Sequence, residues 1–217
     1  MSHARHAAHG LALPTLMGLL AMASLATLLA MRHLWVNELL LNAEADQLRT
    51  RHKAQAVLPL AVQDIVGPSN AASSPSDTSP TTDMRHTVGT DTQTHVFFPS
   101  SVADYPVLRQ RLGADICRAG ICAPTVLDAS ANTASYWKAN TASAMPVAAQ
   151  DMPEGAGTAG YWVEVWPRTE SGQFIYRITV LTNGVLPGSS TVLQAIWTRP
   201  TPTATSGQWQ SWHVLHN

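Results

Sequence analysis

The feature that most constrains this chain is an apolar run near its N-terminus, Leu11 to Met31, which contains no charged side chain. As a helix, the run would span about 31 Å, close to the roughly 30 Å hydrocarbon core of a bilayer. A cleaved secretory signal has a shorter apolar stretch followed by a small-residue cleavage site, whereas this run is longer and ends without a clear site. A buried core helix rarely carries so long an uncharged stretch. The run therefore predicts a single membrane-spanning helix, residues 11–31.

The charges on the two sides of the run do not orient it. Arg5 is the only basic residue of the leader apart from histidines, whereas Arg32, Arg49, Arg51 and Lys53 follow the run. The positive-inside rule alone therefore does not place the N-terminus in the cytoplasm. The Ser/Thr-rich body and the isolated cysteine pair suit an oxidising exterior, so we expect an extracytoplasmic head. The two indications disagree, and the charges leave the orientation open.

The composition argues against several functional classes. The net charge is −1 and charged residues make up 12% of the chain, so no basic surface points to nucleic acid. The nine histidines are scattered without the spacing of a metal site in the folded part. No nucleophile elbow, phosphate-binding glycine loop or other catalytic constellation occurs. We therefore expect no cofactor, no metal and no enzymatic activity.

The pattern after the apolar run stays helical but becomes mixed. Leu34, Leu41 and Leu48 recur every seven residues and would share one helix face, which predicts an amphipathic extension over residues 32–66. Gly67 and Pro68 should end this helix. Residues 67–94 are mostly Ser, Thr, Pro, Asp, Asn and Gly, and they are predicted to be a disordered linker or a long loop.

Residues 95–200 have the pattern of a globular head. A short strand over residues 95–99 and a short helix over residues 102–112 are expected first. Alternating apolar residues then predict an antiparallel meander with three strands, at 161–166, 174–181 and 191–197. The amphipathic part of the helix can cover one face of this sheet, which gives an α+β fold. Residues 201–217 read as an irregular tail, in which Trp209 and Trp212 could dock on the head.

Two cysteines, Cys117 and Cys122, have four residues between them and no third or fourth cysteine elsewhere. This spacing suits one local disulfide in an oxidising compartment. It is not the C-x-x-C spacing of a thiol oxidoreductase. A structural disulfide is therefore expected, with a free or reactive pair as the alternative.

Three separated parts of the chain carry a family resemblance. A short leader, residues 1–10, ends in Gly10, and the apolar run begins at Leu11. The other two parts are Cys-Arg-Ala-Gly-Ile-Cys-Ala-Pro at 117–124 and the segments 176–180 and 192–197. Together they resemble the type IV pilins, and among these the PilX-type minor pilins.

The resemblance implies a pilin-like fold and a defined set of partners. A prepilin peptidase would cut between Gly10 and Leu11, and the new N-terminus would be methylated. The head would lie in the periplasm, with the helix crossing the inner membrane once or packed in an extracellular pilus. The implied partners are other minor and major pilins and the inner-membrane assembly platform.

One position departs from the family pattern. Most pilins carry Glu as the fifth residue of the mature chain, where it neutralises the amino terminus of a neighbouring subunit. Counting from Leu11, this position is Thr15, and a hydroxyl cannot replace a paired charge. The departure is compatible with a subunit that has no neighbour above it, at a filament tip.

These observations predict a minor pilin that primes or caps a type IV pilus. Two alternatives stay open. A pseudopilin of a type II secretion system would share the helix and the tip position. A membrane-anchored periplasmic binding protein would instead use the Trp-rich strands as a ligand surface and keep its leader.

Overall fold

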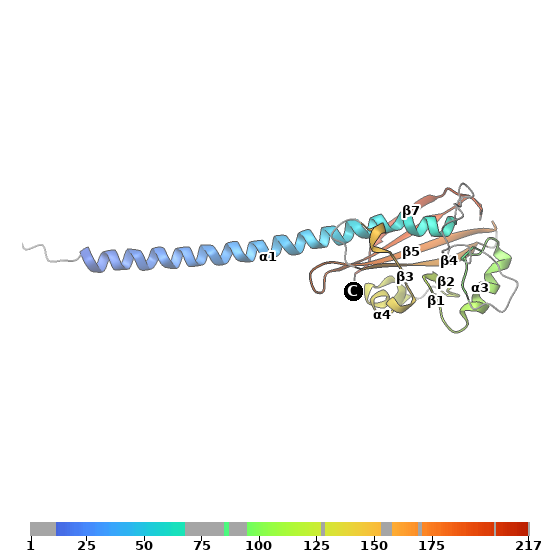
Figure 1. Ribbon diagram of the computed structural model, residues 1–217, viewed down its shortest axis with the longest axis horizontal. Coiled ribbons are helices and arrows are strands. Elements are labelled where there is room, and N and C mark those ends of the chain that lie inside the picture. Colours follow the sequence, from blue (N-terminus) through green and yellow to red (C-terminus); the bar gives the residue numbers. More distant parts are fainter. Residues whose placement is uncertain are drawn as a thin grey trace, which may run out of the picture. The chain divides into compact units, whose positions relative to one another are not determined.

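The computed structural model describes residues 12–67, 85–86, 95–126, 129–152, 158–168, 171–201 and 203–216. It has an α+β fold with a long N-terminal helix and a mostly antiparallel sheet (Figure 1). The chain forms two compact units, Met1–Ala45 and Asp46–Asn217. The helices are α1 (Ala12–Val66), η1 (Val102–Asp104), α3 (Tyr105–Leu112), η2 (Ala129–Asn132), α4 (Ala134–Ala139), η3 (Thr141–Ser143) and η4 (Ala149–Asp151). The strands are β1 (Cys117–Arg118), β2 (Ile121–Cys122), β3 (Met145–Pro146), β4 (Ala159–Arg168), β5 (Gln173–Asn183), β6 (Ser190–Thr198) and β7 (Gln208–Val214).

Helix α1 is one continuous helix of 55 residues, as the sequence predicts for residues 11–66. Pro59 lies inside it without ending it. The helix stops at Val66, and Gly67 follows with a φ of 83°, a left-handed conformation that glycine adopts at little cost. Gly67 is therefore the C-terminal stop that the sequence indicates.

The packed face of α1 differs from the predicted one. Leu48 is exposed, although its spacing from Leu34 and Leu41 suggested a common packing face. The buried side chains recur at three- and four-residue steps, which keeps them on one side of the helix. They are Asp46, Thr50, Lys53, Ala54, Val57, Leu58, Ala61 and Ile65. The helix therefore packs on the sheet through a face that includes small and β-branched residues, and not through the leucine stripe.

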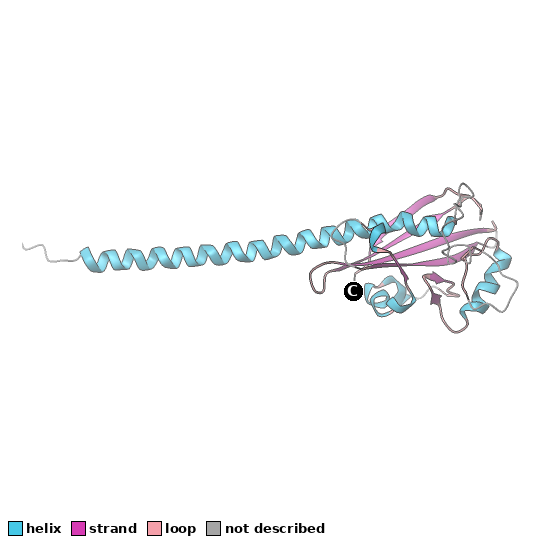
Figure 2. Ribbon diagram, viewed as in Figure 1, coloured by secondary structure: helices cyan, strands magenta, loops and turns pink. Residues whose placement is uncertain are grey.

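The described strands form a seven-stranded sheet in the order β1-β2-β4-β5-β6-β7, with β3 paired to β4 on the side (Figure 2). The strands β4 to β7 are a meander of antiparallel neighbours, and β2 joins β4 in parallel. The three predicted strands correspond to β4, β5 and β6. The antiparallel meander is thereby confirmed.

The sheet separates two apolar clusters. On one face, Val163, Ile178 and Leu193 pack with Val57 and Ala61 of α1 and with α3. On the other face, Trp162, Leu181 and Val192 pack with Trp137 of α4. The alternation of side chains along each strand divides these sets, as the sequence pattern requires.

Three segments differ from the predictions. Residues 95–99 form no strand, although Val96, Phe97 and Phe98 are buried in the first cluster. Residues 208–214 are strand β7, so the prediction of an irregular tail is wrong there. A register shift in the β6–β7 pairing breaks the two-residue alternation on which strand prediction depends.

The polar segment 67–94 is described at three residues only, Gly67, Arg85 and His86. Arg85 is buried and hydrogen-bonded, which a disordered linker would not provide. Of the two predicted alternatives, Arg85 therefore fits a long loop and not a disordered linker. Residues 68–84 and 87–94 lie outside the described residues.

Candidate functional site

The first part of α1 exposes apolar side chains all around the helix. It is the one described helix that is long and apolar enough to cross a membrane, and its apolar stretch is not buried in the protein. The exposed large side chains include Leu13, Leu16, Leu19, Leu20, Leu25, Leu28, Leu29, Leu39, Leu40 and Leu41. A helix that is apolar on every side is stable in lipid or among other apolar helices. This part of α1 is therefore a candidate membrane anchor.

Two hydroxyl groups of this part of α1, those of Ser24 and Thr27, are satisfied by the helix itself. The Ser24 hydroxyl donates to the Leu20 carbonyl at 2.8 Å, and the Thr27 hydroxyl donates to the carbonyls of Ala23 and Ser24. Such bonds are what a hydroxyl needs where no water is present. The hydroxyls therefore do not prevent this part of the helix from entering an apolar phase.

The structure describes the Thr15 position but not the predicted cleavage site. Gly10 and Leu11 lie outside the described residues. Thr15 lies in the first turns of α1 and is exposed. Pro14 stands beside it, where the absent N–H has no carbonyl to bond in any case.

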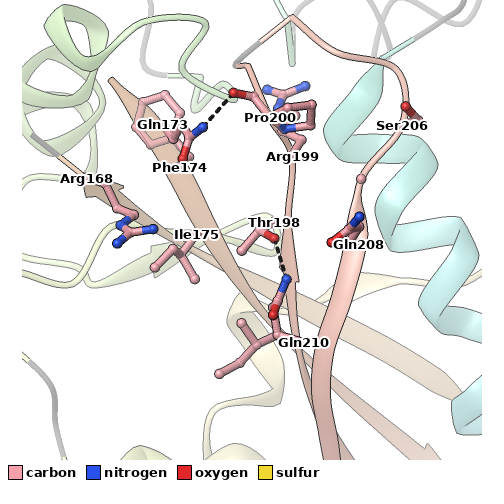
Figure 3. A pocket seen from close by; sticks show the side chains of 12 residues that line it. Arg168, Gln173, Phe174, Ile175, Thr198, Arg199, Pro200, Ser206, Gln208 and Gln210 are labelled. Carbon is pink, nitrogen blue, oxygen red and sulfur yellow. Dashed lines mark hydrogen bonds between the residues drawn. The ribbon is translucent and has the colours of Figure 1, made fainter. Parts of the chain in front are cut away.

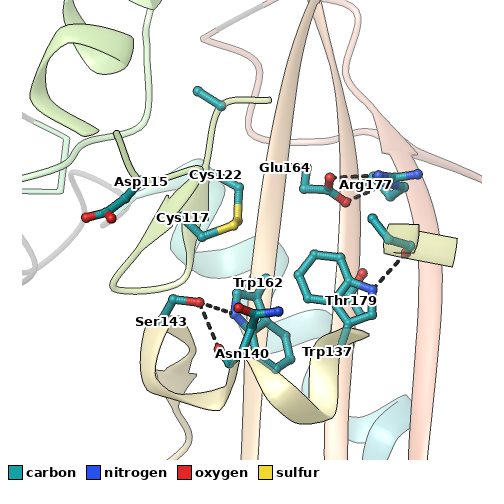
Figure 4. The surroundings of a disulfide bond; sticks show 12 residues. Asp115, Cys117, Cys122, Trp137, Asn140, Ser143, Trp162, Glu164, Arg177 and Thr179 are labelled. Carbon is teal, nitrogen blue, oxygen red and sulfur yellow. Dashed lines mark hydrogen bonds and ion pairs between the residues drawn. A yellow bond between two sulfur atoms is a disulfide. The ribbon is translucent and has the colours of Figure 1, made fainter. Parts of the chain in front are cut away.

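The cysteine pair forms the predicted disulfide. Cys117 and Cys122 face each other at the end of the β1–β2 hairpin, with an S–S distance of 2.06 Å (Figure 4). The turn residues Ala119 and Gly120 have φ values of 49° and 77°, the pair of positive values that a tight two-residue hairpin requires. The bond closes a hairpin, which favours the structural role over a reactive pair.

The hairpin turn is fixed to the sheet on both sides. The N–H of Gly120 donates to the Ser143 carbonyl, and the N–H of Val163 donates to the Gly120 carbonyl, each at 2.7 Å. A Cβ on Gly120 would lie 2.5 Å from the Cβ of Met145. The hairpin therefore connects β3 and β4 through a close backbone approach that only glycine permits.

A buried ion pair lies on the face of the sheet next to the disulfide. Glu164 on β4 stands opposite Arg177 on β5, and Arg177 also donates to Asn132 at 3.1 Å. Figure 4 shows this pair close to Trp162 and the disulfide. Trp162 and Glu164 are almost fully buried, so most of this strand face is covered and offers no ligand platform.

A second buried network joins the end of α1 to the sheet. Arg85 donates to both Asp64 carboxylate oxygens, at 2.9 and 2.6 Å, and to the Ala119 carbonyl at 2.8 Å. The Tyr161 hydroxyl donates to Asp64 at 2.8 Å. Burial, followed by the charge of Asp64, raises the pKa of Tyr161, so Tyr161 stays a neutral donor. Sequence reasoning missed Arg85, because nothing in a polar segment marks one residue for burial.

The hairpin between β5 and β6 is held by Asp46. The N–H groups of Val185 and Leu186 each donate to the Asp46 carboxylate at 3.1 Å. The hydroxyl of Ser189, followed by these amides, lowers the pKa of Asp46. Gly184 lies against the same carboxylate, so a side chain at residue 184 would collide with it.

A groove with a volume of about 630 Å³ lies at one end of the sheet (Figure 3). Two of its amide groups are already used within the protein. Gln173 donates to the Pro200 carbonyl at 2.7 Å, and Gln210 donates to the Thr198 hydroxyl at 3.0 Å. This groove is therefore a weak candidate for a ligand site.

A smaller groove, about 270 Å³, lies between α1 and β7 and is lined by Gln55, Leu58, Pro59, Trp209 and Trp212. We call it the β7 groove. Trp209 and Trp212 are 44% and 50% exposed, so they do not dock on the head as closely as the sequence suggested. Sequence reasoning noted the two tryptophans but not the helix residues that face them.

Within the described ranges, no three His, Cys, Asp or Glu side chains gather as metal ligands. Comparison with family models, curated proteins and solved structures found no match to this chain. The candidate surfaces therefore rest on their own geometry: the apolar part of α1, the disulfide hairpin and the β7 groove.

Proposed function

We propose that this protein is a minor pilin that takes part in assembling a type IV pilus, as a subunit that primes or caps the filament. The observation that carries the proposal is the division of α1. A single unbroken helix exposes apolar side chains in residues 13–41 and then packs on an antiparallel sheet from residue 46 onward. A helix built in this way serves as a membrane anchor before assembly and as a core element among similar helices afterwards.

The remaining features agree with a pilin-like layout. The head combines α1 with the meander β4–β7, and a disulfide hairpin lies at the β4 side of the sheet. In this proposal, the prepilin peptidase cuts after Gly10, and the protein waits in the inner membrane with its head in the periplasm. Its partners are then other minor and major pilins and the inner-membrane assembly platform.

Thr15 restricts where the subunit can stand. The chain lacks the carboxylate that would neutralise the amino terminus of the next subunit, so Thr15 offers no charge to a neighbour above it. A carboxylate there would be costly in an apolar environment unless it were paired. The tip of the filament, where no such neighbour exists, is the position that this residue favours.

The test is the mature N-terminus of the protein from its native membrane, read by mass spectrometry. We expect a chain that begins at Leu11 with a methylated amino group. Gly10→Phe should leave the leader uncut and reduce the number of surface pili, counted by electron microscopy. Gly18→Phe is the matched control for leader cleavage alone, because residue 18 has open space around it and lies beyond the cleavage site.

Each rival function has its own outcome in this test. A wild-type chain that keeps Met1, or a Gly10→Phe chain that is processed normally, would contradict the pilin proposal and favour an anchored binding protein. Normal processing of the wild type with unchanged pili but impaired protein secretion in a deletion strain would favour a type II secretion pseudopilin.

A further inference from the structure

Strand β7 leaves one edge of the sheet open. It pairs with β6 on one side and with no described strand on the other. Its sequence, Gln-Trp-Gln-Ser-Trp-His-Val, contains neither proline nor a lysine, arginine or carboxylate, and most of its side chains are exposed. Edge strands that stay single are commonly blunted by charge, proline or a covering segment. β7 has none of these among the described residues, which makes it an open template for strand pairing.

The main-chain groups that face outward can be assigned. The N–H of Leu215 donates to the Val192 carbonyl of the neighbouring strand at 2.8 Å. Because N–H and C=O groups alternate sides along a strand, His213 also points towards β6, opposite Gln194. Trp212 and Val214 therefore direct their N–H and C=O groups to the open edge.

The β7 groove lies on the α1 side of this same edge. Trp212 is opposite Ala195 and Trp209 is opposite Trp197, and both partners belong to the face that packs on α1. A strand added to β7 would lie about 4.8 Å from it, with every second side chain on this face. Those side chains would enter the groove between the tryptophans and Leu58.

Helix α1 adds a polar group to the groove wall. Pro59 has no N–H, so the carbonyl of Gln55 cannot receive the usual helical hydrogen bond from residue 59. Gln55 and Pro59 both line the groove. The wall thus combines the apolar side chains of Leu58 and Pro59 with the polar residue Gln55.

The positive charge of Arg51 at the rim of the β7 groove favours one kind of bound segment. The guanidinium carbon of Arg51 lies 5.7 Å from the centre of the Trp212 ring, and the Arg51 side chain is exposed. No carboxylate occurs among the described residues that line the groove or form β7. A second copy of this chain would bring its own Arg51 to the shared edge. A segment that carries an acidic residue complements the rim instead.

We propose that β7 is the docking site for an extended segment of a different protein. The segment adds to the sheet as a further strand, hydrogen-bonded to Trp212 and Val214. Its apolar side chains fill the β7 groove, and a Glu or Asp lies beside Arg51. This inference is independent of leader cleavage. An uncut leader would contradict the pilus function but would not contradict the docking site.

The probes are capped nine-residue peptides, added to the full chain in detergent micelles. Leu and Val alternate with Thr, and one Glu stands at either end; a second set has Lys in place of Glu. A third set is the Glu peptide with alternate main-chain nitrogens methylated, which removes strand pairing and keeps the side chains. We expect saturable binding of the Glu peptides, at least tenfold weaker binding of the Lys set, and no binding of the methylated set.

Two measurements locate the bound peptide. Hydrogen exchange of the amides of Trp212 and Val214 should slow on binding, because these N–H groups become hydrogen-bonded. Trp212→Ala should weaken binding at least tenfold, as expected for an aromatic anchor. Arg51→Gln should abolish the preference for Glu over Lys. Val126→Ala is the control, because Val126 is exposed but lies outside the groove.

Several outcomes would overturn the proposal. One is that none of the peptides binds, and another is that the methylated peptides bind as well as the others. A dimer of the full chain in detergent that is lost in Trp212→Ala would assign the edge to a second copy. Binding of a neutral oligosaccharide at Trp212 in place of the peptides would assign the groove to a sugar.

Discussion

Arg177 on β5 donates two hydrogen bonds to the Glu164 carboxylate on the paired strand β4, from Nε at 2.5 Å and from Nη2 at 2.7 Å. Both side chains are less than one-tenth exposed. The two residues lie directly opposite each other in the register, so the pair fixes how β4 aligns with β5. A one-residue slip of β5 would turn Arg177 to the other face, into the apolar cluster beneath α1, and separate it from Glu164.

Breaking this pair should be costly. Arg177→Met removes the guanidinium from the buried Glu164 carboxylate beside Trp162, and we expect a loss of about 3–5 kcal/mol in the free energy of unfolding. Arg118→Met is the matched control, since Arg118 and Asp115 are 40% and 60% exposed, and it should cost about 1 kcal/mol or less. Near-ultraviolet circular dichroism during denaturant unfolding measures both. Equal losses would show that burial does not set the strength of the pair.

The disulfide should contribute a modest and local stabilisation. It closes a short loop, with a sequence separation of 5, for which loop entropy predicts about 2 kcal/mol. The double variant Cys117→Ser with Cys122→Ser should fold with a lower melting temperature. A reductant should lower the wild-type melting temperature to a similar extent and leave the double variant unchanged. A complete loss of structure in the variant would contradict this local role.

Substitutions at two glycines with positive φ can distinguish the cost of backbone strain from the cost of a steric collision. Gly113 and Gly120 have φ values of 63° and 77°, but only Gly120 has neighbours where a Cβ would stand. We expect Gly113→Ala to cost about 1 kcal/mol, from its conformation alone. Gly120→Ala should cost clearly more, because the Met145 backbone would have to move. Comparable melting temperatures of the two variants would show that β3 yields easily.

The lowered pKa of Asp46 makes the head sensitive to acid. A carboxyl with a lower pKa in the folded protein stabilises it fully above the unfolded pKa, about 3.9, and loses that contribution as pH falls through the folded pKa. Unfolding free energies between pH 2 and 6 should therefore decrease less steeply below pH 4 in Asp46→Asn than in the wild type. Ser189→Ala, which removes the first contributor, should lie between them. Parallel curves for wild type and Asp46→Asn would refute this role.

Strong periodic signals made much of the fold predictable. The apolar run and its mixed continuation predicted α1, and the alternation from Tyr161 to Trp197 predicted β4, β5 and β6. The local disulfide followed from the spacing of Cys117 and Cys122. Each of these features is encoded within a short window of sequence.

The features that escaped prediction depend on distant partners. Arg85 meets Asp64 across 21 positions, and Asp46 reaches Val185 across 139. Trp209 and Trp212 are three residues apart and still share one face, because the register shift lies between them. No local pattern marks such contacts. The β7 groove therefore could not be predicted from the sequence, because it is formed by residues of α1 and β7 that are far apart in the chain.

The long separation between α1 and its partner strands has a consequence for biosynthesis. Residues 46–66 are synthesised before the sheet. Thr50, however, is hydrogen-bonded to Thr191 and Thr182, which lie 141 and 132 positions later in the chain. The inward face of α1 must therefore wait without its sheet until almost the whole chain has been made. During that interval, Val57, Ala61 and Ile65 have no sheet to pack against, and the unfinished chain exposes them to premature association.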